Sequence, residues 1–97
     1  MPYKDIKVRN QWFKNRYIRI KKKIQEYKIR YGCKDCGYNA HHAALEFDHL
    51  PEFDKSFNVS KITGRGEAMV FREIAKCDIV CRNCHGIRTW NRIKRTI

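Results

Sequence analysis

The first third of the chain carries one apolar stripe at the spacing of an α-helix. Between residues 6 and 31, apolar side chains recur every three or four positions, and basic side chains fill most of the gaps. This period places the apolar residues on one face, which we expect to pack against the rest of the protein, opposite a solvated basic face. Gly32 follows directly, and glycine often stands just past a helix end. The members of the stripe are Phe13, Tyr17, Ile20, Ile24, Tyr27 and Tyr31.

The middle of the chain changes from helical spacing to alternation. Residues 43–49 alternate apolar and polar positions, which predicts a β-strand with Leu45 and Phe47 on one face. Residues 50–66 are mostly polar and hold one proline and two glycines. We therefore expect this second segment to form a loop.

The last third predicts two helices separated by a short apolar segment. Residues 67–77 have the pattern of a short amphipathic helix, and residues 78–80 are long enough only for a strand or a turn. A second basic helix is expected from residue 82 to about residue 95, with Trp90 packed against the core. The apolar side of the first of these helices is expected to hold Met69, Val70, Ile74 and Cys77.

The length of the chain limits the size of its core. A chain of 97 residues corresponds to one domain, and a domain this small often needs a metal ion or disulfides to stay folded. We expect a single domain over residues 1–97, in which a basic helical extension (1–32) precedes a compact core (33–97).

The charge is strongly positive. The chain has 22 lysines and arginines against 10 aspartates and glutamates, a formal net charge of +12. Such an excess attracts polyanions, of which DNA and RNA are the commonest partners. An acidic membrane surface is the alternative. The chain has no apolar run long enough to span a bilayer and no signal-peptide pattern at its start, so we expect a cytoplasmic protein with reduced thiols.

Two Cys-x-x-Cys pairs predict a structural zinc site. They are Cys33 with Cys36, and Cys81 with Cys84, and 44 residues separate the pairs. Four thiolates complete a tetrahedral zinc shell and leave no open position, which is typical of a structural ion. The alternative is two unrelated buried or redox pairs. The fifth cysteine, Cys77, is expected to be a small core residue.

The stretch "CRNCH" that ends the second pair also matches the haem-attachment pattern of c-type cytochromes. That interpretation needs export to an oxidising compartment and leaves Cys33 and Cys36 unexplained, so we disfavour it.

Taken together, "CKDCG", "ALEFDH" and "EIAKCDIVCRNCH" resemble the HNH endonuclease family, especially its small phage and bacterial members with paired zinc cysteines. The resemblance runs from about Cys33 to Thr89. It implies an α+β fold, the ββα-metal finger, in which a second strand at about 78–81 pairs with residues 43–48. The two cysteine pairs would then meet beneath the site.

The resemblance also implies roles for three residues. Asp48 corresponds to the carboxylate that binds a catalytic divalent ion, His85 to the second ligand, and His49 to the general base. The ion would be Mg²⁺ or Mn²⁺, with Ni²⁺ possible because imidazole suits later metals. Histidine exchanges its proton near neutral pH, which suits a base. The implied activity is DNA endonuclease, nicking one strand to leave 5′-phosphate and 3′-hydroxyl ends.

Without the resemblance, these residues have plainer interpretations. Asp48 is then an ordinary polar strand end, His49 is a satisfied or exposed histidine, and His85 could replace one cysteine as a zinc ligand. His41 and His42 are expected to be solvated.

The sequence departs from the family pattern at two positions. The family's middle asparagine, which braces the loop between the strands, falls at Lys76, and Asn58 is too distant in sequence to be assigned its role. Many relatives carry another metal-binding histidine one turn after the position of His85, where this chain has Thr89 as a candidate ligand. Asn91 lies on a different helix face.

The expected partner is DNA, with phage packaging proteins as a further candidate, and the chain is expected to be a monomer or a weak dimer that does not bind membranes. A zinc-stabilised nucleic-acid-binding module without activity is the alternative function, and a membrane- or protein-docking adaptor is a third. The predicted nucleic-acid contacts are Lys14, Arg16, Arg19, Lys21, Lys22, Lys23, Lys55, Arg88 and Arg92.

Overall fold

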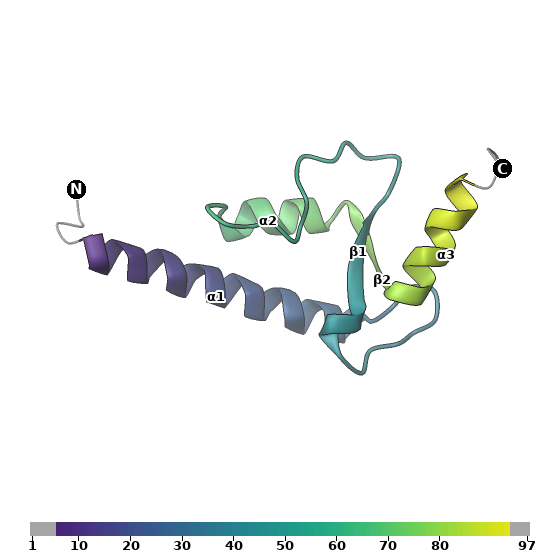
Figure 1. Ribbon diagram of the computed structural model, residues 1–97, viewed down its shortest axis with the longest axis horizontal. Coiled ribbons are helices and arrows are strands. Elements are labelled where there is room, and N and C mark those ends of the chain that lie inside the picture. Colours follow the sequence, from purple (N-terminus) through teal and green to yellow (C-terminus); the bar gives the residue numbers. More distant parts are fainter. Residues whose placement is uncertain (1–5, 94–97) are drawn as a thin grey trace.

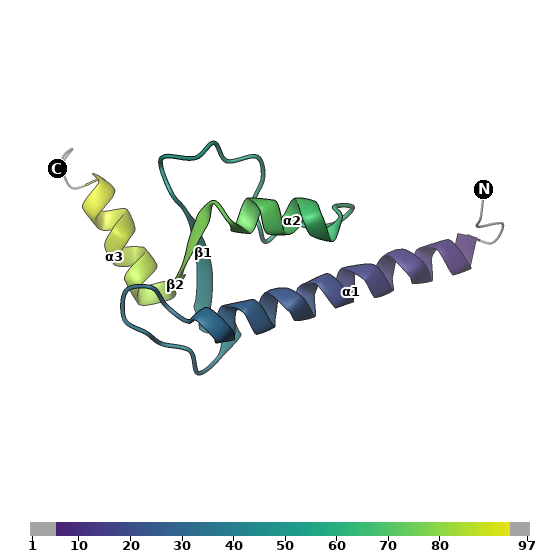
Figure 2. The ribbon, with the colours of Figure 1, turned by 180° about the vertical axis from the view of Figure 1, so that it is seen from behind.

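A computed structural model describes residues 6–93, which form a small α+β structure about 57 Å long. The longest element is α1, Ile6–Tyr31, as its periodicity predicts. Its apolar stripe is buried only in the C-terminal half, at Ile20 and Ile24, because the N-terminal half extends beyond α2 and the strands (Figures 1 and 2). Phe13 and Tyr17 are therefore 46% and 38% exposed, and Tyr31 at the other end of the stripe is 61% exposed, so the expected packing of the whole stripe is wrong at both ends.

The end of α1 turns sharply at Gly32. Its φ of 66° lies in the left-handed region, which glycine adopts without steric cost, and its N–H donates to the carbonyl of Lys28 at 2.8 Å. A Cβ atom at this position would also lie 3.1 Å from the carbonyl oxygen of Tyr38. This turn leads directly into the first cysteine pair.

Two antiparallel strands form the centre of the fold. β1, Leu45–His49, pairs with β2, Cys77–Cys81, so that Leu45 faces Cys81 and His49 faces Cys77. The strand begins two residues later than predicted, because His42–Ala44 form a short 3-10 helix, η1. The ring of His41 caps η1 by accepting the N–H of Ala43 at 3.0 Å.

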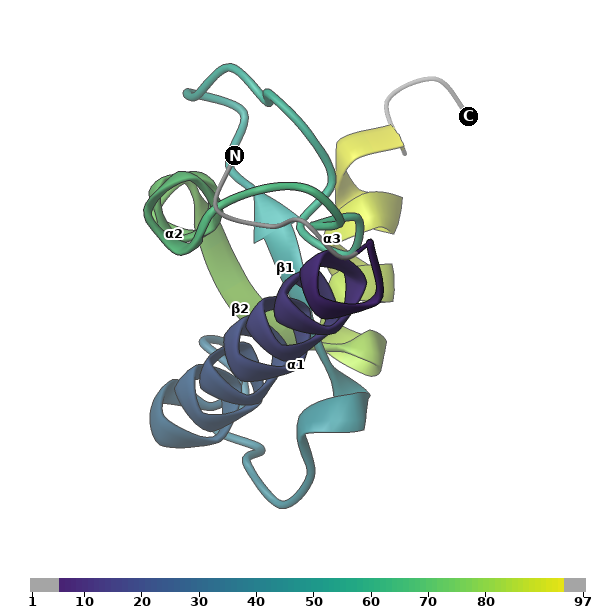
Figure 3. The ribbon, with the colours of Figure 1, turned by 90° about the vertical axis from the view of Figure 1, so that its left-hand side faces the viewer.

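Two further helices flank this hairpin. α2, Glu67–Ile74, lies on one side and α3, Arg82–Ile93, on the other, as the view along α1 shows (Figure 3). α2 ends three residues earlier than predicted, so Cys77 belongs to β2. The expected residues 94 and 95 of the last helix lie outside the described residues.

The predicted packing fails at two side chains of these helices. Met69 of α2 is 46% exposed, although Val70 and Ile74 are buried as expected. Trp90 of α3 is 53% exposed, so the prediction that it packs against the core is wrong. α3 meets the hairpin instead through arginine and histidine side chains, described below.

The core consists of two adjoining apolar clusters. The first cluster lies where α1 and α2 contact each other, and it also includes Val59 and Ile62 from the loop between β1 and α2. The other lies around the hairpin and includes Cys33 and Cys81. Tyr27 and Phe47 are partly buried and pack against both. Among residues 6–93, no helix is long and apolar enough to cross a membrane.

Candidate functional site

The four paired cysteines meet at one point. Their sulfur atoms all lie within 4.8 Å of one another, and the Sγ atoms of Cys36 and Cys81 are 3.7 Å apart. Tetrahedral zinc with Zn–S bonds near 2.3 Å separates its sulfurs by about 3.8 Å. The cluster could therefore hold a metal ion such as zinc, and it joins the end of α1 to the start of α3.

Both cysteine pairs have the same local geometry. The N–H of Cys36 points at the sulfur of Cys33 at 3.4 Å, and the N–H of Cys84 points at the sulfur of Cys81 at the same distance. Burial opposes ionisation of Cys33, but backbone hydrogen bonds, first that of Cys81, outweigh it and lower the pKa of this thiol to about 6. Contact with Cys81, together with burial, raises the pKa of Cys84. Thiolates this close repel one another, and a bound cation would relieve the repulsion.

Asp48 and His85 lie next to each other between β1 and α3. Strand alternation turns Glu46 and Asp48 toward α3, and His85 stands in the first turn of that helix. The Nε2 atom of His85 is 3.6 Å from Oδ1 of Asp48, and its Nδ1 is 2.9 Å from Oε1 of Glu46. Glu46 was not among the predicted site residues, although its position two residues before Asp48 on the same strand face is a signal that could have identified it.

Two arginines of α3 hold the Asp48 carboxylate, which is 3% exposed. Arg92 contacts both oxygens at 2.8 Å, and Arg88 contacts Oδ2 at 2.9 Å. Burial alone would raise the pKa of Asp48, but the hydrogen bonds from Arg92 and Arg88 outweigh it and lower the pKa. Arg88 is also bound by Asp35 and Asp78. Both arginines were predicted to contact DNA, and in this structure both contact carboxylates.

His49 points to the other side of the hairpin and meets a buried carboxylate. Its Nε2 lies 2.9 Å from Oε2 of Glu73, a residue of α2 that is 2% exposed. The same oxygen accepts the N–H of Ser56 at 3.0 Å, and the other oxygen pairs with Lys76 at 2.9 Å. Burial would raise the pKa of Glu73, but these three partners, first Lys76, outweigh it and lower the pKa to about 2.

The helical period of α2 gives a signal for Glu73 that the sequence analysis did not use. Glu73 lies three residues after Val70 and directly before Ile74, and both of these are buried. A glutamate on the apolar face of a short helix predicts a buried carboxylate with partners.

Lys76 also forms hydrogen bonds with the loop that follows β1. Its Nζ donates to the carbonyl oxygen of Asp54 at 2.8 Å and to Oγ of Ser56 at 3.1 Å. Lys76 is the position at which the resemblance expected a bracing asparagine. Here a lysine, anchored by Glu73, makes contacts that brace the loop.

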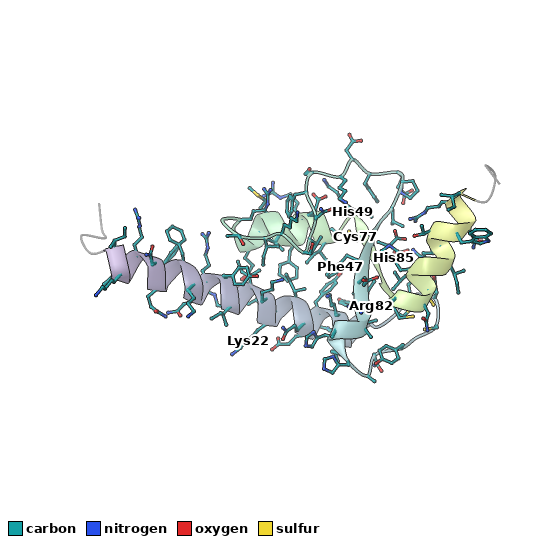
Figure 4. All side chains as sticks on the ribbon, viewed as in Figure 1. Lys22, Phe47, His49, Cys77, Arg82 and His85 are labelled. Carbon is teal, nitrogen blue, oxygen red and sulfur yellow. The ribbon has the colours of Figure 1, made fainter. Side chains whose placement is uncertain are left out.

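A groove of about 400 Å³ brings the two histidines together along the open edge of β1. His49 and His85 both line it, at different heights of the hairpin (Figure 4). Lys55 was the one residue of the groove wall predicted to contact nucleic acid. Two further cations belong to the wall. Lys28 is part of the basic face expected on the first helix, whereas Arg82 of α3 was missed because only the fold brings α3 beside this groove.

The remaining candidates lie away from this groove. Thr89 is exposed on α3 one turn after His85, and Asn91 is exposed beyond it. His41 is exposed as expected, whereas His42 is half-buried. Cys77 packs against the first core cluster, and burial, with Glu73 and Asp48 nearby, raises its pKa to about 11.

Comparison of the chain with models of protein families, with curated proteins and with solved structures found no match.

Proposed function

We propose that this chain is a metal-dependent DNA endonuclease of the HNH type, with a structural zinc ion in the four-cysteine cluster. One observation carries the proposal. Asp48 and His85 approach to 3.6 Å, and His85 shares a groove with His49, in a chain of net charge +12. A carboxylate, two imidazoles and surrounding lysines are the groups that phosphodiester hydrolysis needs.

Asp48 and His85 offer one carboxylate and one imidazole to the catalytic ion. This mixed oxygen and nitrogen set suits Mg²⁺ or Mn²⁺, with water and a substrate phosphate completing the shell. When bound, the ion supplies charge stabilisation at the leaving 3′ oxygen. Arg92 would turn away from Asp48 to admit it, which its 41% exposed side chain allows. Arg88 would stay, because Asp35 and Asp78 also hold it.

His49 is the proposed general base. The carboxylate of Glu73, with a pKa of about 2, is ionised at neutral pH and can only accept a hydrogen bond. It therefore selects the neutral tautomer of His49 that carries the proton on Nε2 and leaves the Nδ1 lone pair free. The side chain of His49 lines the groove and is 15% exposed, and the proposal places its free Nδ1 against the water of the groove.

The proposed reaction follows from these positions. Nδ1 of His49 takes a proton from water as the water oxygen attacks phosphorus. The bond from phosphorus to the 3′ oxygen breaks, and that oxygen receives a proton from solvent. The products are a 5′-phosphate and a 3′-hydroxyl, and a single site cuts one strand at a time.

The test is nicking of supercoiled plasmid with added Mg²⁺ or Mn²⁺, with products separated on agarose. Wild type should convert the plasmid to open circles, His49→Ala should lose the activity by about 100-fold or more, and His42→Ala should retain it. If the plasmid stays intact with the wild-type protein and either ion, the proposed endonuclease activity is refuted.

A non-catalytic nucleic-acid-binding module is the second candidate. It is favoured by the pairing of both Asp48 oxygens with Arg88 and Arg92, a network that is complete without a metal ion. This function predicts salt-sensitive DNA binding and intact plasmid under every metal condition.

A further inference from the structure

Three lysines of α1 lie on one line along the helix. Lys14, Lys21 and Lys28 are separated by seven residues each. Seven residues correspond to two turns less about 20°, so these side chains form a nearly straight row with about 10.5 Å between neighbours. We call these three residues the lysine row. It runs beside the apolar stripe of α1, because each lysine directly follows one of its members.

The lysine row begins and ends in two different depressions of the surface. Lys28 lines the groove that holds His49 and His85. Lys14 lines a second groove of about 350 Å³, between α1 and the loop around Thr63. The row therefore forms a continuous path from the distal half of α1 to the proposed catalytic groove.

Lys21 and Lys28 are close enough to affect each other. Burial first, and then the charge of Lys21, lower the pKa of Lys28; the carboxylate of Glu46 acts in the opposite direction, and Arg82 adds to the lowering. The charges are thus concentrated where the row enters the groove. A phosphate placed there would relieve the repulsion.

The lysines on the other sides of α1 do not lead to the groove. Lys23, on the opposite flank, forms an ion pair with Glu67 of α2 at 2.9 Å. Lys22 points away from α2 and the loop (Figure 4). The sequence analysis grouped both with Lys14 and Lys21 as nucleic-acid contacts, and the fold separates them.

We infer that the lysine row is a docking surface for the backbone of duplex DNA, which it leads into the groove between His49 and His85. Charge complementarity and continuity with that groove identify the occupant. The row spans about 21 Å, equal to about six base-pair rises of 3.4 Å. The inference rests on the DNA-binding part of the proposed function and does not require cleavage.

The test is the salt dependence of binding to a fluorescent 30-base-pair duplex, measured by anisotropy with no divalent ion added. The variant is Lys14→Gln with Lys21→Gln. The matched control, Lys22→Gln with Arg72→Gln, removes the same two charges from outside the row. Each lost phosphate contact reduces the magnitude of the slope of log K against log salt by about 0.9. We therefore expect the row variant to reduce this magnitude by about 1.8, and the control variant to reduce it by less than half of that.

Equal losses of slope in the two variants would overturn the inference, because they would indicate diffuse charge alone. Tighter binding of single-stranded DNA than of the duplex would also overturn the inference. So would binding of phosphatidylserine vesicles without binding of DNA. Circular dichroism checks that both variants keep the helix content of the wild type. Since no catalytic ion is present, a failure here is separate from a failure of plasmid nicking.

Discussion

Replacing Glu73 by glutamine tests how the proposed base is held. The substitution keeps the shape of the side chain and an acceptor for the N–H of Ser56, but removes the charge that pairs with Lys76 and contacts His49. Breaking a fully buried ion pair costs about 3–5 kcal/mol. Lys76 and His49 are 26% and 15% exposed, so we expect a smaller loss, about 2 kcal/mol at pH 7.

The size of the loss can be read from thermal unfolding followed by circular dichroism. For a chain of this length, about 2 kcal/mol corresponds to a fall in Tm of roughly 10 °C. Glu67→Gln is the matched control on the same helix, because its pair with Lys23 is exposed on both sides and such pairs contribute about 0.5 kcal/mol. Similar falls in Tm for the two variants would refute the reasoning.

The loss must also depend on pH in a set direction. The pKa of Glu73 is lowered from 4.5 to about 2, so its charge stabilises the fold fully above pH 4.5 and the contribution disappears as pH falls toward 2. The difference in stability between wild type and Glu73→Gln should therefore narrow as the pH falls from 4.5 toward 2. A difference that widens between pH 4.5 and pH 2 would contradict the assignment.

A spectroscopic measurement separates orientation from stability. Imidazole ¹⁵N shifts of neutral His49 should report the proton on Nε2 in the wild type. The glutamine side chain can donate as well as accept, so the variant should lose this strict preference and some nicking activity. A proton on Nδ1 in the wild type would exclude Nδ1 as the base.

Three further predictions concern the metal site, the helix packing and the ion pairs. Cys36→Ser should reduce bound zinc, measured by elemental analysis, and unfold much of the domain, since structural zinc contributes about 10 kcal/mol or more; Cys77→Ser should keep one zinc per chain. Ile20→Ala should lower the free energy of unfolding in urea by about 3 kcal/mol, whereas the exposed Ile18→Ala should change it by less than about 0.5 kcal/mol. Arg92→Gln should tighten Mn²⁺ binding several-fold, measured by loss of the free-ion EPR signal, because a cation leaves the proposed metal-binding carboxylate; weaker binding would contradict that placement.

The placement of Asp48 and His49 illustrates why the site was only partly predictable. Strand alternation alone turns these neighbours to opposite faces, so the sequence indicates that they have different surroundings. Which partners they meet depends on what covers each face. Asp48 meets arginines from a helix 40 residues later, and His49 meets a carboxylate 24 residues later.

What the sequence determined by itself is local in origin. The period of α1, the alternation around Leu45 and the two Cys-x-x-Cys pairs are spacings of a few residues, which backbone geometry converts directly into a helix, a strand and two pairs of neighbouring thiols. Only the tertiary structure decided that half of the α1 stripe stays exposed, that Glu73 and Lys76 hold His49 and its loop, and that Lys28 reaches the groove. These contacts depend on how separate elements pack, and packing selects among many partners that the local sequence leaves equally available.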